Sequence, residues 1–130
     1  MKVIIETIPH DQQRYDTVGD WSWEDVETLC IKVSAEMPDI RMSFLVAIHE
    51  LVEALQCRHD GVTEKEVDEF DLDPETMRYC KEFDIEPGDH PISPYRNQHC
   101  LATGVERILC STFGLNWAEY EDSLNELSNS

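Results

Sequence analysis

The chain has no long hydrophobic run and few basic residues. No apolar stretch approaches the roughly 18 residues that a membrane helix needs, and the segment after Met1 lacks a signal-peptide core. Only 10 Lys and Arg residues accompany 28 Asp and Glu, which gives a formal net charge of −18. Ordinary binding to nucleic acid or anionic lipid depends on basic side chains. We therefore expect a cytoplasmic protein that binds neither nucleic acid nor membranes.

Paired cysteine motifs are also missing. The count of five is odd and includes no Cys-x-x-Cys pair; the residues are Cys30, Cys57, Cys80, Cys100 and Cys110. This pattern argues against a disulfide framework and against a ribbon-type zinc site, and favours reduced thiols. Cys57 and Cys100 are potential soft metal ligands, although a buried cysteine is ordinarily a small hydrophobic residue.

The first part of the chain predicts a small sheet. With 130 residues and 41% hydrophobic content, the chain fits a single domain, 1–130. Residues 2–8 and 27–34 are rich in β-branched side chains, and residues 18–23 can supply a third strand. Short connections favour antiparallel pairing. We expect a β-rich region over 1–36, with an antiparallel sheet of two or three strands.

The remainder, residues 37–127, predicts four or five helices and hence an α+β fold. Asp39 can cap a helix over about 40–59 that stops before Gly61, and Thr63 with Glu66 forms a capping box for the next helix. Further helices are predicted to begin at Asp73-Pro74, to run from about 94 to 113, and to begin at Asn116.

The helix over 40–59 carries ionisable residues where a core is expected. His49 and Glu53 lie about 40° apart in projection, on an arc that is otherwise apolar. Burial of an imidazole and a carboxylate is unfavourable unless each has a partner. Spacing of i and i+4 lets both side chains reach one metal ion at bonds of about 2.0–2.2 Å.

The segment His49-Glu50-Leu51-Val52-Glu53 resembles the His-Glu-x-x-His helix of the zincin metallopeptidases. In that family both histidines bind zinc and the glutamate activates a water molecule. Here Glu53 replaces the second histidine. The resemblance implies a metal-dependent hydrolase with Glu50 as the general base and zinc as the metal, while manganese or iron also suits a set of His and Glu ligands.

A second helix offers the missing ligand. His99 and Glu106 are seven residues apart and about 20° apart in projection, again on an apolar stripe. If the two helices pack together, His99 completes a triad with His49 and Glu53. Glu106 is then a fourth ligand, or accepts the second N–H of one histidine. His59 is a rival ligand, since its spacing from His49 matches that of the metzincins; His90 ranks below both.

An alternative needs no metal. His49, Glu53, His99 and Glu106 can instead pair with one another as a buried network that fixes helix register. Residues 60–94 contain twelve acids, for which a solvated surface is the ordinary explanation. From this segment Asp68, Glu69 and Asp71 could add carboxylates to a site. In this alternative the protein is a non-enzymatic acidic protein that binds a host protein or imitates DNA.

Several segments together resemble a small family of uncharacterised phage and prophage proteins. They are Ala47–Leu55, Glu66–Asp71, Glu86–Asp89, Pro94-Tyr95, His99–Leu109 and Gly114–Tyr120. The resemblance covers most of the chain and implies a phage or bacterial origin, with the host cytoplasm as the location. It implies no particular reaction, so the substrate or host-protein partner stays unknown.

Overall fold

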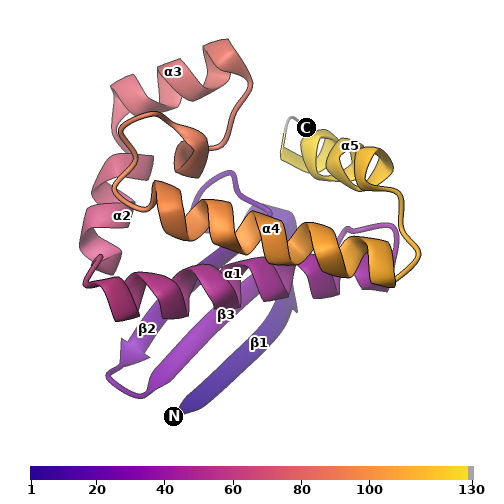
Figure 1. Ribbon diagram of the computed structural model, residues 1–130, viewed down its shortest axis with the longest axis horizontal. Helices are drawn as coiled ribbons and strands as arrows, with labels where there is room; N and C mark the ends of the chain where they lie inside the picture. Colours follow the sequence, from indigo (N-terminus) through magenta and orange to yellow (C-terminus); the bar gives the residue numbers. More distant parts are fainter. Residues whose placement is uncertain (129–130) are drawn as a thin grey trace.

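Three strands and five α-helices form the part of the chain that this computed structural model describes, residues 1–128 (Figure 1). The strands are β1 (Lys2–Ile8), β2 (Gly19–Asp25) and β3 (Thr28–Ser34), and the helices are α1 (Ile40–Asp60), α2 (Glu64–Asp71), α3 (Pro74–Phe83), α4 (Arg96–Thr112) and α5 (Trp117–Ser128). Two 3-10 turns, η1 (His10–Gln12) and η2 (Pro87–Asp89), lie in connections. The α+β class expected from the sequence is confirmed.

The sheet is mixed, which corrects the expectation of wholly antiparallel pairing. Its strand order is β1-β3-β2; β2 runs antiparallel to β3, whereas β1 runs parallel to it. The parallel pair arises because residues 9–18 carry the chain past β3 to the far edge of the sheet. Gln13 holds this crossover, since its amide donates to the main-chain carbonyls of Val18 and Lys32. The three strand positions agree with the sequence prediction.

Helix α1 forms the middle layer of the molecule. One side of it packs on β2 and β3 and another packs along α4 (Figure 1). On the sheet side, the buried residues Leu29, Ile31 and Val33 of β3 share a core with Leu45 and Val46 of α1. No helix among the described residues has the length and apolar character needed to cross a membrane.

The helix ends form where the sequence indicates them. Asp39 caps α1 by accepting a hydrogen bond from the Arg41 N–H, and Gly61 ends the helix with a φ of 77°. The Thr63 and Glu66 capping box opens α2. Helices α2 and α3 lie toward one end of α4, while α5 lies toward the other (Figure 1). Both flanking regions therefore stand close enough to add residues to a site between α1 and α4.

Candidate metal centre

His49, Glu53, His99 and Glu106 meet at the buried contact between α1 and α4. The two histidines are 5–8% exposed, and Glu53 and Glu106 are each 6% exposed. The Nε2 atom of His49 lies 3.1 Å from Glu53 Oε2 and 3.2 Å from His99 Nδ1. His99 Nδ1 lies 2.9 Å from the same Glu53 oxygen. One atom from each of three side chains thus forms a compact triangle.

The size of this triangle suits a divalent cation. Ligand atoms around four-coordinate zinc, with bonds of about 2.0–2.1 Å, lie roughly 3.3 Å apart. In a six-coordinate site with bonds of about 2.1 Å the separation is roughly 3.0 Å. The edges of 2.9, 3.1 and 3.2 Å compare well with both values. The spacing of these atoms of His49, Glu53 and His99 is therefore compatible with ligation of one ion, and two imidazoles with one carboxylate suit zinc, manganese or iron.

The second nitrogen of each imidazole is held by a carboxylate. His49 Nδ1–H donates to Glu106 Oε1 at 2.8 Å, and the other oxygen of Glu106 accepts a hydrogen bond from the Tyr120 hydroxyl. His99 Nε2 lies 3.1 Å from Glu86 Oε2 and 3.4 Å from Asp89 Oδ1. Metal-ligating histidines have this arrangement, because the carboxylate fixes the ring and its tautomer.

Glu106 therefore lies behind His49, outside the triangle of candidate ligand atoms. Of the two roles left open by the sequence, this position favours the hydrogen-bond acceptor over the fourth ligand.

The surrounding carboxylates raise the pKa of both histidines. Burial by itself lowers the pKa of His49, but hydrogen bonds with Glu106 and Glu53 outweigh it and raise the pKa well above its ordinary value. His99 behaves in the same way, with burial opposed by Asp89, Glu53 and Glu86, and the pKa is raised. Burial also opposes ionisation of Glu53, yet the two histidines lower its pKa. The carboxylates thus favour protonation of both rings, and a bound ion would compete with these protons.

Glu50 follows His49 on α1, and its side chain is partly buried against Gly19 of β2. A Cβ atom added to Gly19 would lie 2.9 Å from Glu50 Oε1 and 2.7 Å from Val46 Cγ1, so this glycine makes room for the carboxylate. Burial raises the pKa of Glu50 well above its ordinary value, and the negative charge of Glu53 raises it further. A carboxylate with a raised pKa is suited to exchange protons near neutral pH.

Several residues around the centre were not recognised from the sequence. Gly88 of η2 packs on the His99 ring, where an added Cβ would lie 2.3 Å from Cγ. The Trp21 indole N–H donates to Glu53 Oε1 at 3.0 Å, and Tyr120 reaches Glu106 from α5. Glu86 lies in the acid-rich segment 60–94 and in one segment of the phage-family resemblance, and neither observation predicted a contact with His99. The sequence around Gly88 and Trp21 does not indicate a role at this site, because each residue reaches the site only through the tertiary fold.

Other candidate ligands lie elsewhere. His59 is exposed and pairs with the neighbouring Asp60, and His90 packs against Phe70 and Tyr79. Asp68 pairs with Arg14, Glu69 with Lys65, and Asp71 accepts a hydrogen bond from Tyr95. Cys57 is buried and Cys100 is exposed, and neither belongs to the groups of His, Cys and acidic side chains that could hold an ion among residues 1–128.

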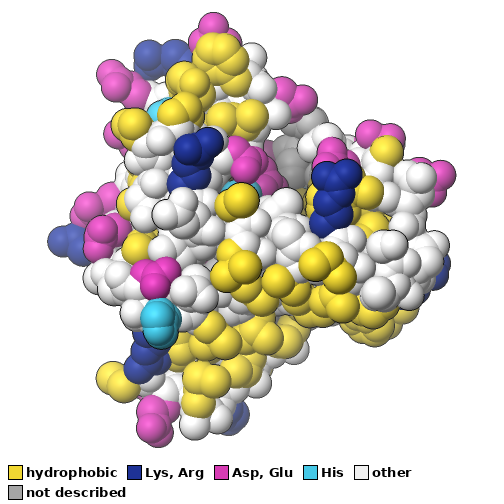
Figure 2. Space-filling model, viewed as in Figure 1, with side chains coloured by type: hydrophobic (Ala, Val, Ile, Leu, Met, Phe, Trp, Pro, Cys, Tyr) yellow, Lys and Arg dark blue, Asp and Glu magenta, His cyan; other side chains and the backbone are white. Residues whose placement is uncertain are grey.

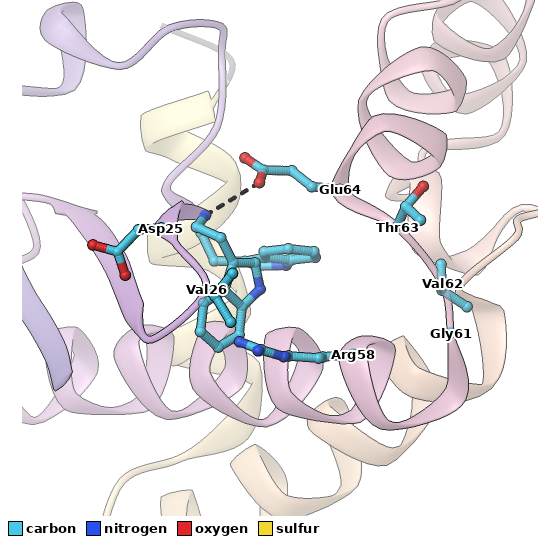
Figure 3. A pocket seen from close by; sticks show the side chains of 9 residues that line it. Asp25, Val26, Arg58, Gly61, Val62, Thr63 and Glu64 are labelled. Carbon is cyan, nitrogen blue, oxygen red and sulfur yellow. Dashed lines mark hydrogen bonds between the residues drawn. The ribbon is translucent and has the colours of Figure 1, made fainter. Parts of the chain in front are cut away.

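An open pocket of about 350 Å³ lies between the β2–β3 hairpin and the junction of α1 with α2 (Figure 3). Its walls include Trp21, Trp23 and Arg58, and the guanidinium of Arg58 stacks 4.2 Å from the centre of the Trp23 ring. The carboxylate of Glu64 accepts a hydrogen bond from the Trp23 main-chain N–H (Figure 3). Trp21 is shared by the pocket and the candidate metal centre, since its indole N–H also donates to Glu53.

No protein-family model matches the chain, and neither the curated proteins nor the solved structures include a significant match.

Proposed function

We propose that this protein binds one divalent metal ion through His49 Nε2, Glu53 Oε2 and His99 Nδ1. The observation that carries the proposal is that each histidine aims one nitrogen at a shared point while a carboxylate holds its other nitrogen. A register-fixing ion pair needs no such two-sided arrangement. Zinc is our first choice of metal, with manganese and iron as alternatives.

We further propose that the metal serves hydrolysis. A divalent ion supplies Lewis-acid activation of water. Glu50 is the residue of this chain suited to take the proton, because it neighbours His49 and its pKa is raised by burial. Amides and esters are the substrate class that this chemistry fits. The chain's own contribution is to hold the ligands, to keep Glu106 behind His49 and to place Glu50 beside them.

A second function is favoured by a separate observation. The buried cluster is hydrogen-bonded without an ion; among residues 1–128, Gln13 Oε1 is the buried side-chain oxygen or nitrogen that lacks a partner. A protein of net charge −18 with such a network could act by binding a basic host protein through its acidic surface. In that case His49, Glu53 and His99 serve only the fold.

Zinc titration calorimetry on chelator-treated protein distinguishes these proposals. We expect one zinc ion per chain in the parent and at least tenfold weaker binding in Glu53→Gln, which removes one ligand charge. Glu50→Gln is the matched control on the same helix, and it should bind zinc like the parent. Any zinc-dependent amide or ester hydrolysis by the parent should be lost in Glu50→Gln. If the folded parent does not bind zinc, the metal proposal is rejected, and the proposal of an acidic protein that binds a basic host protein remains.

A further inference from the structure

The outer sides of α1, α4 and β1 form a continuous apolar face. It consists of Val3 and Ile5 of β1, Phe44, Ile48, Leu51 and Leu55 of α1, and Leu101, Val105 and Ile108 of α4. Figure 2 shows hydrophobic side chains gathering over these three elements. Four of these hydrophobic side chains are about half exposed or more: Ile108 66%, Ile5 51%, Phe44 48% and Leu101 47%. Monomeric proteins rarely leave large contiguous apolar patches in water.

The pattern has a simple origin in the helices. Phe44, Ile48, Leu51 and Leu55 follow the i, i+4, i+7, i+11 spacing that keeps side chains on one side of a helix, and the apolar residues of α4 follow the same spacing. This stripe is separate from the inward side that carries His49 and Glu53. Leu51 and Leu55 are partly buried against the core, whereas Phe44, Leu101 and Ile108 are 47–66% exposed, so the described chain covers this side of the two helices only in part.

The face is also free of acidic residues, in a chain that contains 28 of them. Between residues 40 and 59 the acids are Glu50 and Glu53, and in α4 the acid is Glu106; Glu53 and Glu106 are buried between the helices, and Glu50 lies against Gly19 of β2. In β1 the acid is Glu6, which follows Ile5 and therefore points to the other side of the sheet. A basic partner would be attracted to the acidic surface elsewhere. Two copies of a chain with a net charge of −18 repel each other, so this uncharged face is where they can approach most closely.

Strand β1 extends the same face with an open edge. It pairs with β3 on one side, and within the described chain no strand covers its other side. Such an edge presents main-chain N–H and C=O groups that readily pair with another strand. A two-fold axis beside β1 would join two sheets and bring the apolar sides of α1 and α4 from both copies toward the same interface.

We propose that the apolar face of α1, α4 and β1 is the interface of a homodimer. Contact across it buries apolar side chains without burying a carboxylate, which is the condition for stable association of so acidic a chain. The proposal is independent of the proposed metal centre, because the apolar residues of α1 and α4 that form the face lie on the opposite side of each helix from the candidate ligands.

Sedimentation equilibrium of the purified full chain tests the dimer. The monomer mass is 15.1 kDa, and we expect the parent to sediment at twice this mass. Ile108→Glu and Ile5→Glu place a charge on the face from two different elements, and each should weaken self-association at least a hundredfold. Ile92→Glu is the matched control, since Ile92 is 76% exposed and lies in the turn after η2, away from the face.

Circular dichroism of each variant confirms that it is folded. A parent that stays monomeric at about 0.1 mM overturns the proposal, whether or not another protein occupies the face. A dimer that survives both glutamate substitutions, or that Ile92→Glu dissociates equally, also overturns it.

Discussion

In both His49 and His99, each of the two ring nitrogens faces a carboxylate. In His49, Nδ1 faces Glu106 and Nε2 faces Glu53; in His99, Nε2 faces Glu86 and Asp89 while Nδ1 faces Glu53. Each ring is thus fixed from two sides. The chemistry of the centre depends on how firmly these carboxylates hold the rings, which single substitutions can measure.

The Tyr120 hydroxyl is the outermost link to His49. Tyr120→Phe leaves Glu106 Oε2 without its donor, so the carboxylate holds His49 less firmly. Removal of outer-shell partners typically weakens metal binding about 10–100-fold, and we expect about tenfold weaker zinc binding by calorimetry. Tyr95→Phe is the matched control, because it also removes a buried hydroxyl that donates to a carboxylate, that of Asp71. Equal zinc affinity in Tyr120→Phe and the parent would contradict a positioning role for Tyr120.

Asp71 should make stability depend on pH. Burial raises the pKa of Asp71 from 3.8 to about 7, and the hydrogen bond from Tyr95 offsets this only in part. Between these two values the folded state holds a proton that the unfolded chain releases, so stability falls as the pH rises from about 4 to about 7. Asp71→Asn removes this loss, which amounts to at most about 4 kcal/mol.

Urea unfolding of metal-free protein at pH 4.5 and pH 8 measures the effect. The free energy of unfolding of Asp71→Asn, relative to the parent, should be greater at pH 8 than at pH 4.5. Asp122→Asn on the exposed side of α5 is the control for loss of one surface carboxylate. A relative stability of Asp71→Asn that does not change with pH would mean that Asp71 ionises normally in the folded protein.

At the scale of elements, the sequence indicates the two helices that build the centre. The i, i+4 spacing of His49 and Glu53 and the i, i+7 spacing of His99 and Glu106 each put polar residues on an apolar stripe. This pattern predicts that α1 and α4 pack together, and they do. Helix caps were equally predictable, because each depends on residues close in sequence.

The contacts that depend on long-range packing could not be predicted. Strand β1 pairs parallel with β3 because of the crossover of residues 9–18, and the β-branched pattern is the same for either direction. Likewise, nothing in the local sequence brings Glu86 or Tyr120 to the histidines. The periodic residues of the site were therefore recognised, whereas the residues that hold them in place were not.

Turn η2 has a direct effect on the centre through Gly88. In Gly88→Ala the added methyl group would lie 2.3 Å from His99 Cγ and 2.5 Å from Nδ1, so the ring must move. We expect at least tenfold weaker zinc binding by calorimetry, because Nδ1 is a proposed ligand. Gly104→Ala is the control: no atom lies within 4 Å of its added Cβ, and alanine in a helix is favoured by about 0.5–1 kcal/mol. Unchanged binding in both variants would contradict the placement of His99.

Over the whole molecule, acidic residues divide into two groups with different roles. On α1 and α4 the carboxylates of Glu53 and Glu106 are buried at the contact between the two helices, while most of the remaining acids face water. The segment from α2 to η2 contains acids of both groups. Glu86 and Asp89 are exposed to water, yet each also pairs with the buried His99 ring. High net charge alone opposes compaction, so a bound cation among these carboxylates would relieve repulsion and stabilise the fold.

The most direct test of the proposed metal centre is the metal content of untagged protein, measured by elemental mass spectrometry. We expect close to one divalent ion per chain in the parent and almost none in His49→Ala and His99→Ala, with circular dichroism showing that both variants are folded. A parent that contains no metal, even after loading with zinc or manganese, would contradict the account and leave His49, Glu53 and His99 as a buried network within an acidic interaction protein.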